Sequence, residues 1–463
     1  MTEQPWLPVL QTPDDDAYNF TEGDKAIAIA ELGLQFELDD WQKWLIRRIL
    51  QTDADGNFRF RQYLVSMGRQ NGKTTLSSVI LLYFLLAQPM QSTLMCLAST
   101  TAQANIVYKR LANLINSNPA LKARFKPTTE TRGITTKTGT SLQIAPAKGD
   151  ALQGYSTRLV ILDEGHLLPE ATWDAVLVGS SMVPNSLNLM ITTAGSEQSV
   201  LLKRLYSQAR LGQSGLGASI WEAPEELDYS DDKNLATGLY AANPSLYAGR
   251  MDIDRAVEEC RSVPESEMIR YRLNRFVAAE NPFLPASLWL NCEQSVPSNK
   301  PLKIAIDIAP GWTAASIACA WEEDGKIHTD LICSVVKPRF DKFYDLIEAV
   351  FQQNSISEVA INTYAGNEIY TKMKERGIKT YKILKRDDYS APALFYGALA
   401  DGRICKPKND LLDYQMLRVT RKEQGNDYRL IKPSNEVDID AAMATVYASY
   451  LVLIEDRETV QVF

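Results

Sequence analysis

The stretch Met67-Gly-Arg-Gln-Asn-Gly-Lys-Thr74 carries the most information about the fold of this chain. It follows the apolar residues 63–65 and precedes the apolar residues 76–87, which predicts a strand, a loop and a helix in that order. Such a loop binds phosphate. Backbone N–H groups around Gly72 would face the β- and γ-phosphates, Lys73 would add a positive charge, and Thr74 Oγ would complete the shell of a Mg²⁺ ion. Met67 stands where glycine is usual, and Gly68 follows one place later.

A second stretch, Arg158-Leu-Val-Ile-Leu-Asp-Glu-Gly-His166, supports this interpretation. Residues 159–162 are a continuous apolar run, which is typical of a buried parallel strand. Asp163 and Glu164 follow at its C-terminal end, where ligands bind in open α/β sheets. We expect Asp163 to hold the Mg²⁺ through water and Glu164 to orient and deprotonate the attacking water. A plain polar loop would also contain such acids, and the upstream phosphate loop decides between the two.

A third predicted strand, residues 187–191, ends in Thr192-Thr-Ala-Gly195. Hydroxyl groups at this strand end could contact the γ-phosphate and respond to its loss. Strands and helices alternate from about residue 61 to residue 221, as in a mostly parallel sheet. The sequence therefore predicts an α/β domain that binds and hydrolyses a nucleoside triphosphate.

Composition narrows the class of protein. The 463 residues are 45% hydrophobic and 23% charged, as in a globular protein, and suffice for about three domains. The N-terminus lacks the features of a signal peptide, and the longest apolar helical run, residues 79–87, is too short to span a bilayer. Six scattered cysteines and two histidines predict a reducing compartment and argue against zinc or histidine-based metal sites.

Charge gives conflicting indications about nucleic acid. The net charge of −8 disfavours such a partner, whereas residues 370–386 are rich in lysine and arginine, with Glu375 as the one acid. Tyr370 and Tyr381 are interleaved with these cations, and the stretch could follow a phosphate backbone. A solvated helix face followed by an edge strand would look the same, so both interpretations stay open.

The rest of the chain divides into three further parts. Residues 1–60 are expected to be an entry segment of the first domain, with a helix at residues 40–46, ahead of the ATPase core at 61–221. Residues 222–300 begin with an acidic loop and continue with helices at 253–260 and 265–274, which predicts a linking subdomain. Residues 301–463 open a second sheet.

The second sheet has the order of a ribonuclease-H-like fold. Three strands, a helix, a strand and a final helix are predicted at residues 303–307, 314–321, 326–335, 340–353, 358–362 and 441–453. In such folds, acids from the first strand, the fourth strand and the late helix converge on one or two Mg²⁺ ions. Two metals would activate water and stabilise the leaving 3′-oxygen in phosphodiester cleavage. Asp440 is also favourable as a plain first-turn acid, so the expectation rests on the ordered set.

Over essentially its whole length the chain resembles the large terminase subunit of tailed bacteriophages, which packages genomic DNA. The resemblance is carried by residues 68–74, 159–166, 191–195, 439–444 and the stretch from Asn274 to Cys292. It implies a P-loop ATPase domain of the ASCE type with a mostly parallel sheet. A ribonuclease-H-like α/β nuclease domain would follow at residues 301–463.

The resemblance also implies roles for single residues. Gln42 resembles the glutamine that reads the adenine edge, Arg69 the arginine of the phosphate loop, and Thr192-Thr193 the element that couples hydrolysis to movement. The expected nucleotide contacts are Gln42, Gly68, Arg69, Gln70, Asn71, Gly72, Lys73, Thr74, Thr75, Asp163 and Thr193. The expected catalytic residues are Lys73, Arg69, Glu164, Asp307 and Asp440, and the expected metal ligands are Thr74, Asp163, Asp307, Asn362 and Asp440.

The implied function is a viral genome-packaging motor. ATP hydrolysis would drive double-stranded DNA into the procapsid, and an endonuclease using Mg²⁺, with Mn²⁺ as a substitute, would cut the concatemer. Implied partners are the terminase small subunit and the portal protein, with a homo-pentamer during packaging or a monomer in solution. The implied location is the cytoplasm of the infected bacterium, with no membrane association and no place in the mature virion. A helicase-like DNA translocase is the alternative, but it should carry a second motor domain where this chain has a strand-ending acid.

One position departs from the family. The fourth nuclease strand normally ends in an acid, and here it ends in Asn362. An asparagine carbonyl can bind a metal, but it adds no negative charge to offset two divalent ions. The nuclease could be deliberately inactivated, naturally weakened, or rescued by a neighbouring acid, for which Glu368 and Asp438 are better placed than Glu358. We expect weak or absent DNA cleavage.

Overall fold

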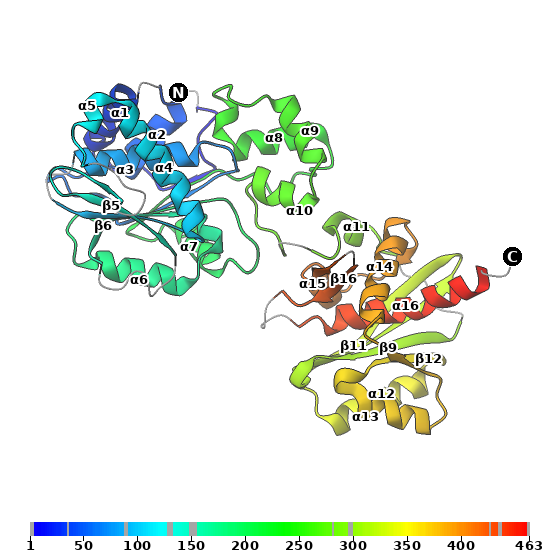
Figure 1. Ribbon diagram of the computed structural model, residues 1–463. Coiled ribbons are helices and arrows are strands. Elements are labelled where there is room, and N and C mark those ends of the chain that lie inside the picture. Colours follow the sequence, from blue (N-terminus) through cyan, green and yellow to red (C-terminus); the bar gives the residue numbers. More distant parts are fainter. Residues whose placement is uncertain are drawn as a thin grey trace. The chain divides into compact units, whose positions relative to one another are not determined.

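The computed structural model describes residues 4–34, 37–87, 91–126, 133–147, 155–279, 282–294, 300–425, 427–433 and 438–460. The chain divides into two units, Met1–Val277 and Ala278–Phe463 (Figure 1). The predicted linking subdomain, residues 222–300, falls on both sides of this division. Its bounds as a functional domain, and those of the other predicted domains, stay predictions.

An eight-stranded sheet in the order β1-β8-β2-β7-β6-β3-β5-β4 forms the centre of the N-terminal unit. Its strands are β1 (Leu10–Gln11), β2 (Gln62–Ser66), β3 (Thr93–Ala98), β4 (Ile134–Thr135), β5 (Ser141–Pro146), β6 (Thr157–Asp163), β7 (Leu187–Thr192) and β8 (Leu216–Ile220). Neighbours from β8 to β5 are parallel, and only the short edge strands β1 and β4 pair antiparallel. The predicted mostly parallel sheet is confirmed. Because β2, β7 and β6 are adjacent, the three predicted phosphate-binding strand ends share one edge.

Helices cover both faces of this sheet (Figure 1). They are α1 (Thr21–Leu34), α2 (Asp40–Ile49), α3 (Lys73–Leu86), α4 (Thr101–Ser117), α5 (Pro119–Lys122), α6 (Glu170–Ser181) and α7 (Val200–Arg210), with a 3-10 turn η2 (Gly165–Leu167). Strand residues alternate between two cores: Tyr63 and Val65 pack with α1 to α4, and Leu64 packs with α6 and α7. Helix α3 is buried on all sides from Leu76 to Leu85, which explains its uninterrupted apolar sequence.

A small helical subdomain completes the N-terminal unit. It comprises α8 (Asp232–Ala242), η3 (Pro244–Leu246), α9 (Ile253–Arg261), α10 (Glu265–Glu267) and the π-helix η4 (Met268–Arg272), around a core of its own. The sequence predicts one regular helix over residues 265–274, whereas the structure has a short α-turn that widens into a π-turn. Such turns often occur at functional sites, and Arg272 of this one donates to Gln70 in the phosphate loop described below.

The C-terminal unit contains a six-stranded sheet in the order β13-β12-β9-β10-β11-β14. Its strands are β9 (Leu302–Ile308), β10 (Ala314–Glu323), β11 (Lys326–Val336), β12 (Ile356–Asn362), β13 (Thr380–Ile383) and β14 (Ile404–Cys405), and a separate hairpin joins β15 (Thr420–Gln424) to β16 (Asp427–Ile431). Strand β10 is antiparallel to β9 and β11, whereas β9, β12 and β13 are parallel. This is the ribonuclease-H-like order that the sequence predicts.

Helices pack on both faces of this second sheet. The helices of the unit are α11 (Ala286–Leu290), η5 (Pro310–Trp312), α12 (Phe340–Gln353), α13 (Thr363–Glu375), α14 (Asp387–Ala400), α15 (Asp410–Met416) and α16 (Asp440–Val460). Isoleucines such as Ile304 and Ile306 pack against α12 and α13. Alanines such as Ala305, Ala318 and Ala360 face α16, and their small side chains let this long helix approach the sheet closely. Within the part of the chain that the structure describes, no helix is long and apolar enough to cross a membrane.

Candidate functional site

The loop between β2 and α3 has the backbone of a phosphate-binding loop. Gly72 precedes α3 with a φ of 73°, and Gln70 also adopts a left-handed φ, of 67°. Lys73 Nζ donates to the carbonyl oxygens of Met67 (3.0 Å) and Gly68 (3.1 Å). The lysine amine therefore lies over the loop whose N–H groups would meet the phosphates.

The charge of Lys73 is poorly solvated at this position. Burial lowers its pKa to about 8, and the nearby carboxylates of Glu164 and Asp163 partly oppose that shift. A partly buried cation attracts an anion more strongly than an exposed one, because less water competes for it. A phosphate group is of the right charge for this cradle.

The helical subdomain braces the loop through a contact between its Asn243 and Asn71 of the loop. Asn71 Nδ2 donates to Gly68 O (3.0 Å) and to Asn243 Oδ1 (2.7 Å), and Ser245 N donates to Asn71 Oδ1 (3.1 Å). A Cβ on Gly68 would lie 2.1 Å from Asn243 Oδ1, so only glycine fits at this position. The side chain of Asn71, expected from the sequence to contact nucleotide, is thus fully used within the protein.

Three other predicted nucleotide contacts have protein partners as well. The Arg69 guanidinium lies 3.4 Å from the centre of the Tyr271 ring. Gln70 Oε1 accepts a hydrogen bond from Arg272 (2.9 Å), and Thr75 Oγ1 accepts one from Arg110 (2.8 Å). Tyr271 and Arg272 belong to the π-turn, so this turn contacts the loop directly.

Gln42 lies beside the same loop. It is buried in the first turn of α2, and its Oε1 accepts a hydrogen bond from Asp39 N (3.0 Å). Its amide Nε2 lies 3.1 Å from the position that a Cβ on Gly72 would take. The structure therefore brings Gln42 to the helix end of the phosphate loop, and its role in contacting the adenine stays a prediction.

Asp163 and Glu164 lie at the end of β6, next to the loop. Asp163 is largely buried, and burial together with the Glu164 charge raises its pKa. Glu164 has a left-handed φ of 58°, which turns the chain sharply after the strand. Its carboxylate Oε2 lies 3.3 Å from His166 Nε2.

The threonine pair follows on β7. Thr192 Oγ1 donates to Thr193 O (2.7 Å), accepts from His166 N (3.1 Å) and lies 3.2 Å from His166 Nδ1. Thr193 is buried, and its Oγ1 has no hydrogen-bond partner among the described residues. A buried hydroxyl without a partner is free to bind a ligand oxygen.

Sequence reasoning missed two residues that organise this strand edge. Asn274, with a φ of 51°, accepts from Ala194 N (2.6 Å) and donates to Ser66 Oγ (3.0 Å) and Trp221 O (2.6 Å), so it joins the ends of β2, β7 and β8. Arg270 donates to Ala194 O (3.3 Å) from the π-turn. Asn274 begins a stretch that resembles the family, but its contacts lie too far along the chain to be read from the sequence.

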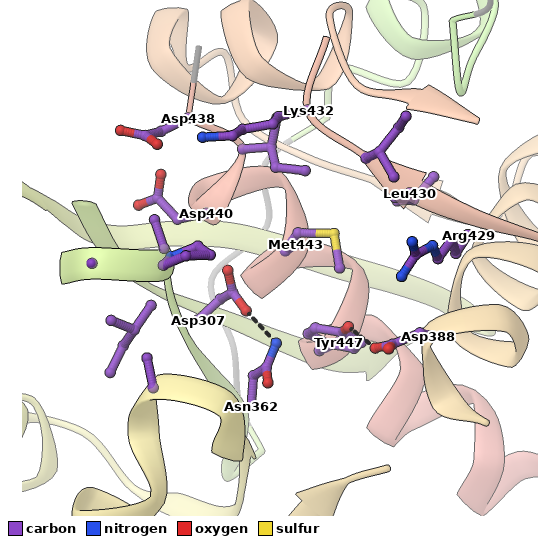
Figure 2. Close-up of a pocket in the computed structure, with 17 residues that line it drawn as sticks. Asp307, Asn362, Asp388, Arg429, Leu430, Lys432, Asp438, Asp440, Met443 and Tyr447 are labelled. Atoms are coloured by element: carbon purple, nitrogen blue, oxygen red, sulfur yellow. Dashed lines mark hydrogen bonds between the residues drawn. The ribbon is translucent and has the colours of Figure 1, made fainter. Parts of the chain in front are cut away.

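The predicted nuclease residues meet in the C-terminal unit (Figure 2). Asp307 on β9 and Asn362 at the end of β12 are joined by a hydrogen bond from Asn362 Nδ2 to Asp307 Oδ1 (3.1 Å). Burial raises the pKa of Asp307 to about 7, with Asn362 opposing the shift and Asp440 adding to it.

Asp440 is fixed at the start of α16. Its carboxylate accepts from Ser316 Oγ (2.5 Å) and Gln415 Nε2 (3.1 Å), while Gln415 Oε1 accepts from Ala441 N (2.8 Å). Gln415 therefore caps the helix and orients the acid at once. Nothing in the sequence around Gln415 indicates this role.

These acids line one cavity of about 530 Å³ (Figure 2). Asp438 also lines it and accepts from Thr313 Oγ1 (3.1 Å). Asp388, which the sequence reasoning missed, lines it too and accepts from Tyr447 OH (2.7 Å). Within the described ranges, no group of three or more histidine, cysteine, aspartate or glutamate residues is gathered as a metal site. Of the predicted metal ligands in this unit, two acids and the amide of Asn362 are the available donors.

Two of the acids considered as replacements for the missing carboxylate lie elsewhere. Glu358 is buried and pairs with Lys379 (3.3 Å) and Lys303 (3.7 Å). Glu368 is exposed and pairs with Lys372 (3.4 Å). Of the three acids named from the sequence, only Asp438 lines the cavity.

The basic stretch at residues 370–386 is engaged with its own unit. Lys372 Nζ lies 4.6 Å from the Phe340 ring centre, and Arg376 pairs with Glu348 at 2.6 Å. These contacts favour a solvated, internally paired helix face over a surface that follows a phosphate backbone.

Comparisons with known proteins agree with the geometry of the first unit. Residues 40–210 match the family described as "Terminase large subunit, ATPase domain". No curated protein matches the sequence.

Several solved structures are similar at low identity. The large terminase of bacteriophage HK97 is 18% identical, with 92% of this chain and 99% of that chain covered and a TM-score of 0.48. A large terminase from a thermophilic bacteriophage, in complex with ATP-gamma-S, is 13% identical, with coverages of 92% and 98% and a TM-score of 0.38. The large terminase nuclease of thermophilic phage G20c with bound magnesium is 10% identical, with coverages of 37% and 98% and a TM-score of 0.30. The family match over residues 40–210 carries the assignment of this segment: it matches the ATPase domain of terminase large subunits.

Proposed function

We propose that this chain is a DNA-packaging motor that hydrolyses ATP to move double-stranded DNA into a procapsid. The observation that carries the proposal is the edge of the first sheet. There, the Lys73 loop, the Asp163–Glu164 strand end and the Thr192–Thr193 strand end come from adjacent parallel strands. The match of this domain to terminase ATPases supports DNA as the substrate that is moved.

The chemistry of the donors fits ATP and Mg²⁺. Lys73 and the loop N–H groups would bind the phosphates, and Thr74 and Asp163 would hold Mg²⁺, which supplies further positive charge when bound. Glu164 would orient the attacking water and take its proton. Thr193, whose buried hydroxyl has no partner within the described residues, would respond to loss of the γ-phosphate. Gln42 would contact the base, and Arg69 would add charge near the loop.

We further propose that the C-terminal unit is a weakened endonuclease. Asp307, Asp440 and the carbonyl of Asn362 would hold Mg²⁺ or Mn²⁺, which would activate water and stabilise the leaving oxygen. Two carboxylates and a neutral amide can balance the charge of one divalent cation, but they do not balance the charge of two such cations. Cleavage of concatemeric DNA by this unit would therefore be slow.

The proposed assembly follows from the packaging role. Several copies, in a pentamer, would act around a portal protein with the help of a terminase small subunit, in the cytoplasm of the infected bacterium. A neighbouring subunit would supply an arginine to complete each ATP site. A chain that is a monomer alone in solution is compatible with this.

The experiment measures ATP hydrolysis by the full chain with and without linear double-stranded DNA, beside a strand-displacement assay. A packaging motor shows DNA-stimulated hydrolysis and leaves the strands paired. A helicase-like translocase, the second candidate, shows stimulation with strand separation. An ATP hydrolysis rate that DNA does not change contradicts both candidate functions. The ribonuclease-H-like order of the second sheet, rather than a second motor domain, favours the first.

A further inference from the structure

His166 connects Glu164 to strand β7 through both nitrogens of its ring. Nε2 lies 3.3 Å from Glu164 Oε2, and Nδ1 lies 3.2 Å from Thr192 Oγ1. The backbone of His166 is fixed as well, because its N–H donates to Thr192 Oγ1 (3.1 Å) and its carbonyl accepts from Ser199 Oγ (2.7 Å). The His166 side chain is 1% exposed, so water does not compete for these bonds.

The protonation state of the ring fixes the direction of the bonds. Burial, assisted by the positive charges of Arg270 and Lys73, lowers the pKa of His166 to about 3, so the ring is neutral near pH 7. A neutral imidazole has one N–H group, and an ionised carboxylate can only accept. A hydrogen on Nε2 would then face Glu164, and Nδ1 would be the acceptor that faces Thr192 Oγ1.

Thr192 has one hydroxyl hydrogen and two acceptors for it. One is Nδ1 of His166, and the other is the carbonyl oxygen of Thr193 at 2.7 Å. The Thr192 hydroxyl thus lies at the strand end that is expected to contact the γ-phosphate. It also contacts the imidazole ring that contacts Glu164. Glu164 is the less constrained partner, because its side chain is 25% exposed.

We propose that His166 is a positioning residue for ATP hydrolysis, which orients the Glu164 carboxylate toward the attacking water and joins it to Thr192. This rests on the proposed role of Glu164 as the residue that activates water. The carboxylate of Glu164 has other rotamers available to it at the solvent side, and His166 selects one of them. Misplacement of a reacting group by about 1 Å lowers a rate by about 100-fold, which sets the expected size of the effect.

Two substitutions of His166 separate the two ends of the ring. The carboxamide of glutamine reaches about as far as Nε2, whereas that of asparagine reaches only as far as Nδ1. In the full chain with saturating DNA, we expect His166→Asn to lower kcat for ATP by about 100-fold with KM unchanged. His166→Gln should restore most of kcat. Normal kcat in His166→Asn, or an equal loss in both variants, would overturn the proposal.

A second pair of variants changes Thr192, the residue that contacts Nδ1 of His166. This test does not depend on whether the His166 variants fold. Thr192→Val removes the hydroxyl at nearly constant shape, and Thr192→Ser keeps it. We expect a lower kcat with unchanged ATP binding in the valine variant and a nearly normal kcat in the serine variant. Equal rates in the two would contradict the anchoring role.

The proposed function itself is tested separately by Glu164→Gln. Sustained hydrolysis in Glu164→Gln would refute the role of Glu164 and the role of His166 together. An inactive Glu164→Gln combined with a normal His166→Asn would refute the positioning role alone.

Discussion

The two candidate sites of this chain are built on the same principle but differ in completeness. Each places polar residues at the C-terminal ends of adjacent parallel strands, β2, β7 and β6 in one unit and β9 and β12 in the other. In the first site Lys73, Asp163 and Glu164 lie close together, and Asn243 and Asn274 hold the neighbouring loops. The second has Asn362 at the position where the family resemblance predicts an acid. Asn362 donates a hydrogen bond to Asp307, whereas an ionised acid there would repel it.

The difference indicates which activity the fold preserves. A neutral amide beside Asp307 relieves the repulsion between buried carboxylates, so it stabilises the metal-free unit while reducing the negative charge available to a metal. In the first site, by contrast, Lys73, Asp163 and Glu164 have no such neutral replacement among them. We expect ATP hydrolysis to be robust and DNA cleavage to be weak.

The largest expected effect is at the first site. Glu164→Gln removes the proposed general base, so we expect ATP turnover to fall by about 100- to 10,000-fold while ATP binding is retained. Steady-state hydrolysis and nucleotide titration measure the two quantities. Glu170→Gln, which changes an exposed acid at the start of α6, is the matched control and should behave like the wild type.

The next largest expected effect is on the free energy of unfolding, and it concerns Asp307 in the second site. The pKa of Asp307 is raised to about 7, so the folded unit favours the protonated acid. This contribution to stability is fully present below the pKa of the unfolded chain and is lost as the pH rises through about 7.

Asp307→Asn should therefore raise the free energy of unfolding of the metal-free chain at pH 8, by up to about 4 kcal/mol, and change it little at pH 4. Chemical denaturation at the two pH values, followed by a probe in the C-terminal unit, measures the difference. An equal effect at both pH values would show that the pKa of Asp307 is not raised in the folded unit.

A smaller effect tests the brace on the phosphate loop. Gly68→Ala places a Cβ 2.1 Å from Asn243 Oδ1, so it should destabilise the N-terminal unit by about 1–3 kcal/mol and weaken ATP binding. Thermal unfolding with and without ATP measures both. Gly397→Ala is the control, because a Cβ at that helical position meets nothing within 4 Å. Similar melting of the two variants would argue against the brace.

The smallest expected effect sharpens the comparison most. Asn362→Asp restores the third carboxylate, and plasmid cleavage by the full chain with Mg²⁺ or Mn²⁺ should rise by about tenfold. Glu358→Gln, on the same strand but paired with Lys379 and Lys303, should leave cleavage unchanged. Vigorous cleavage by the wild type that Asn362→Asp does not alter would contradict a weakened nuclease.

Much of the fold follows from the sequence, because its signals are local. Apolar runs mark β2, β6 and β7, and the glycine-containing loop and the Asp163–Glu164 pair sit at their ends. The order of strands and helices after residue 300 is enough to predict the second sheet. The bracing residues are different. Asn243 and Asn274 act through partners about 80 to 200 positions away along the chain, such as Ala194 and Asn71, and no local pattern encodes such contacts.

The site in the C-terminal unit shows the same limit. Asp307, Asn362 and Asp440 are predictable because the fold places strand ends and a late helix together. Asp388 lines the cavity from α14, and Gln415 holds Asp440 from α15. Both positions depend on how those helices pack. The regular helix predicted over residues 265–274 also failed to anticipate the π-turn, because tertiary contacts to the phosphate loop decide the local winding.

The most direct test of the packaging role is protection of DNA from nuclease inside procapsids. Full chain, ATP, linear double-stranded DNA, the small subunit and portal-bearing procapsids of the same virus are combined, and DNase-resistant DNA is measured. We predict protected DNA with the wild type, none with Glu164→Gln, and nearly normal protection with His166→Gln. Protection that persists with Glu164→Gln, or its absence while ATP is hydrolysed in response to DNA and procapsids, would contradict the account.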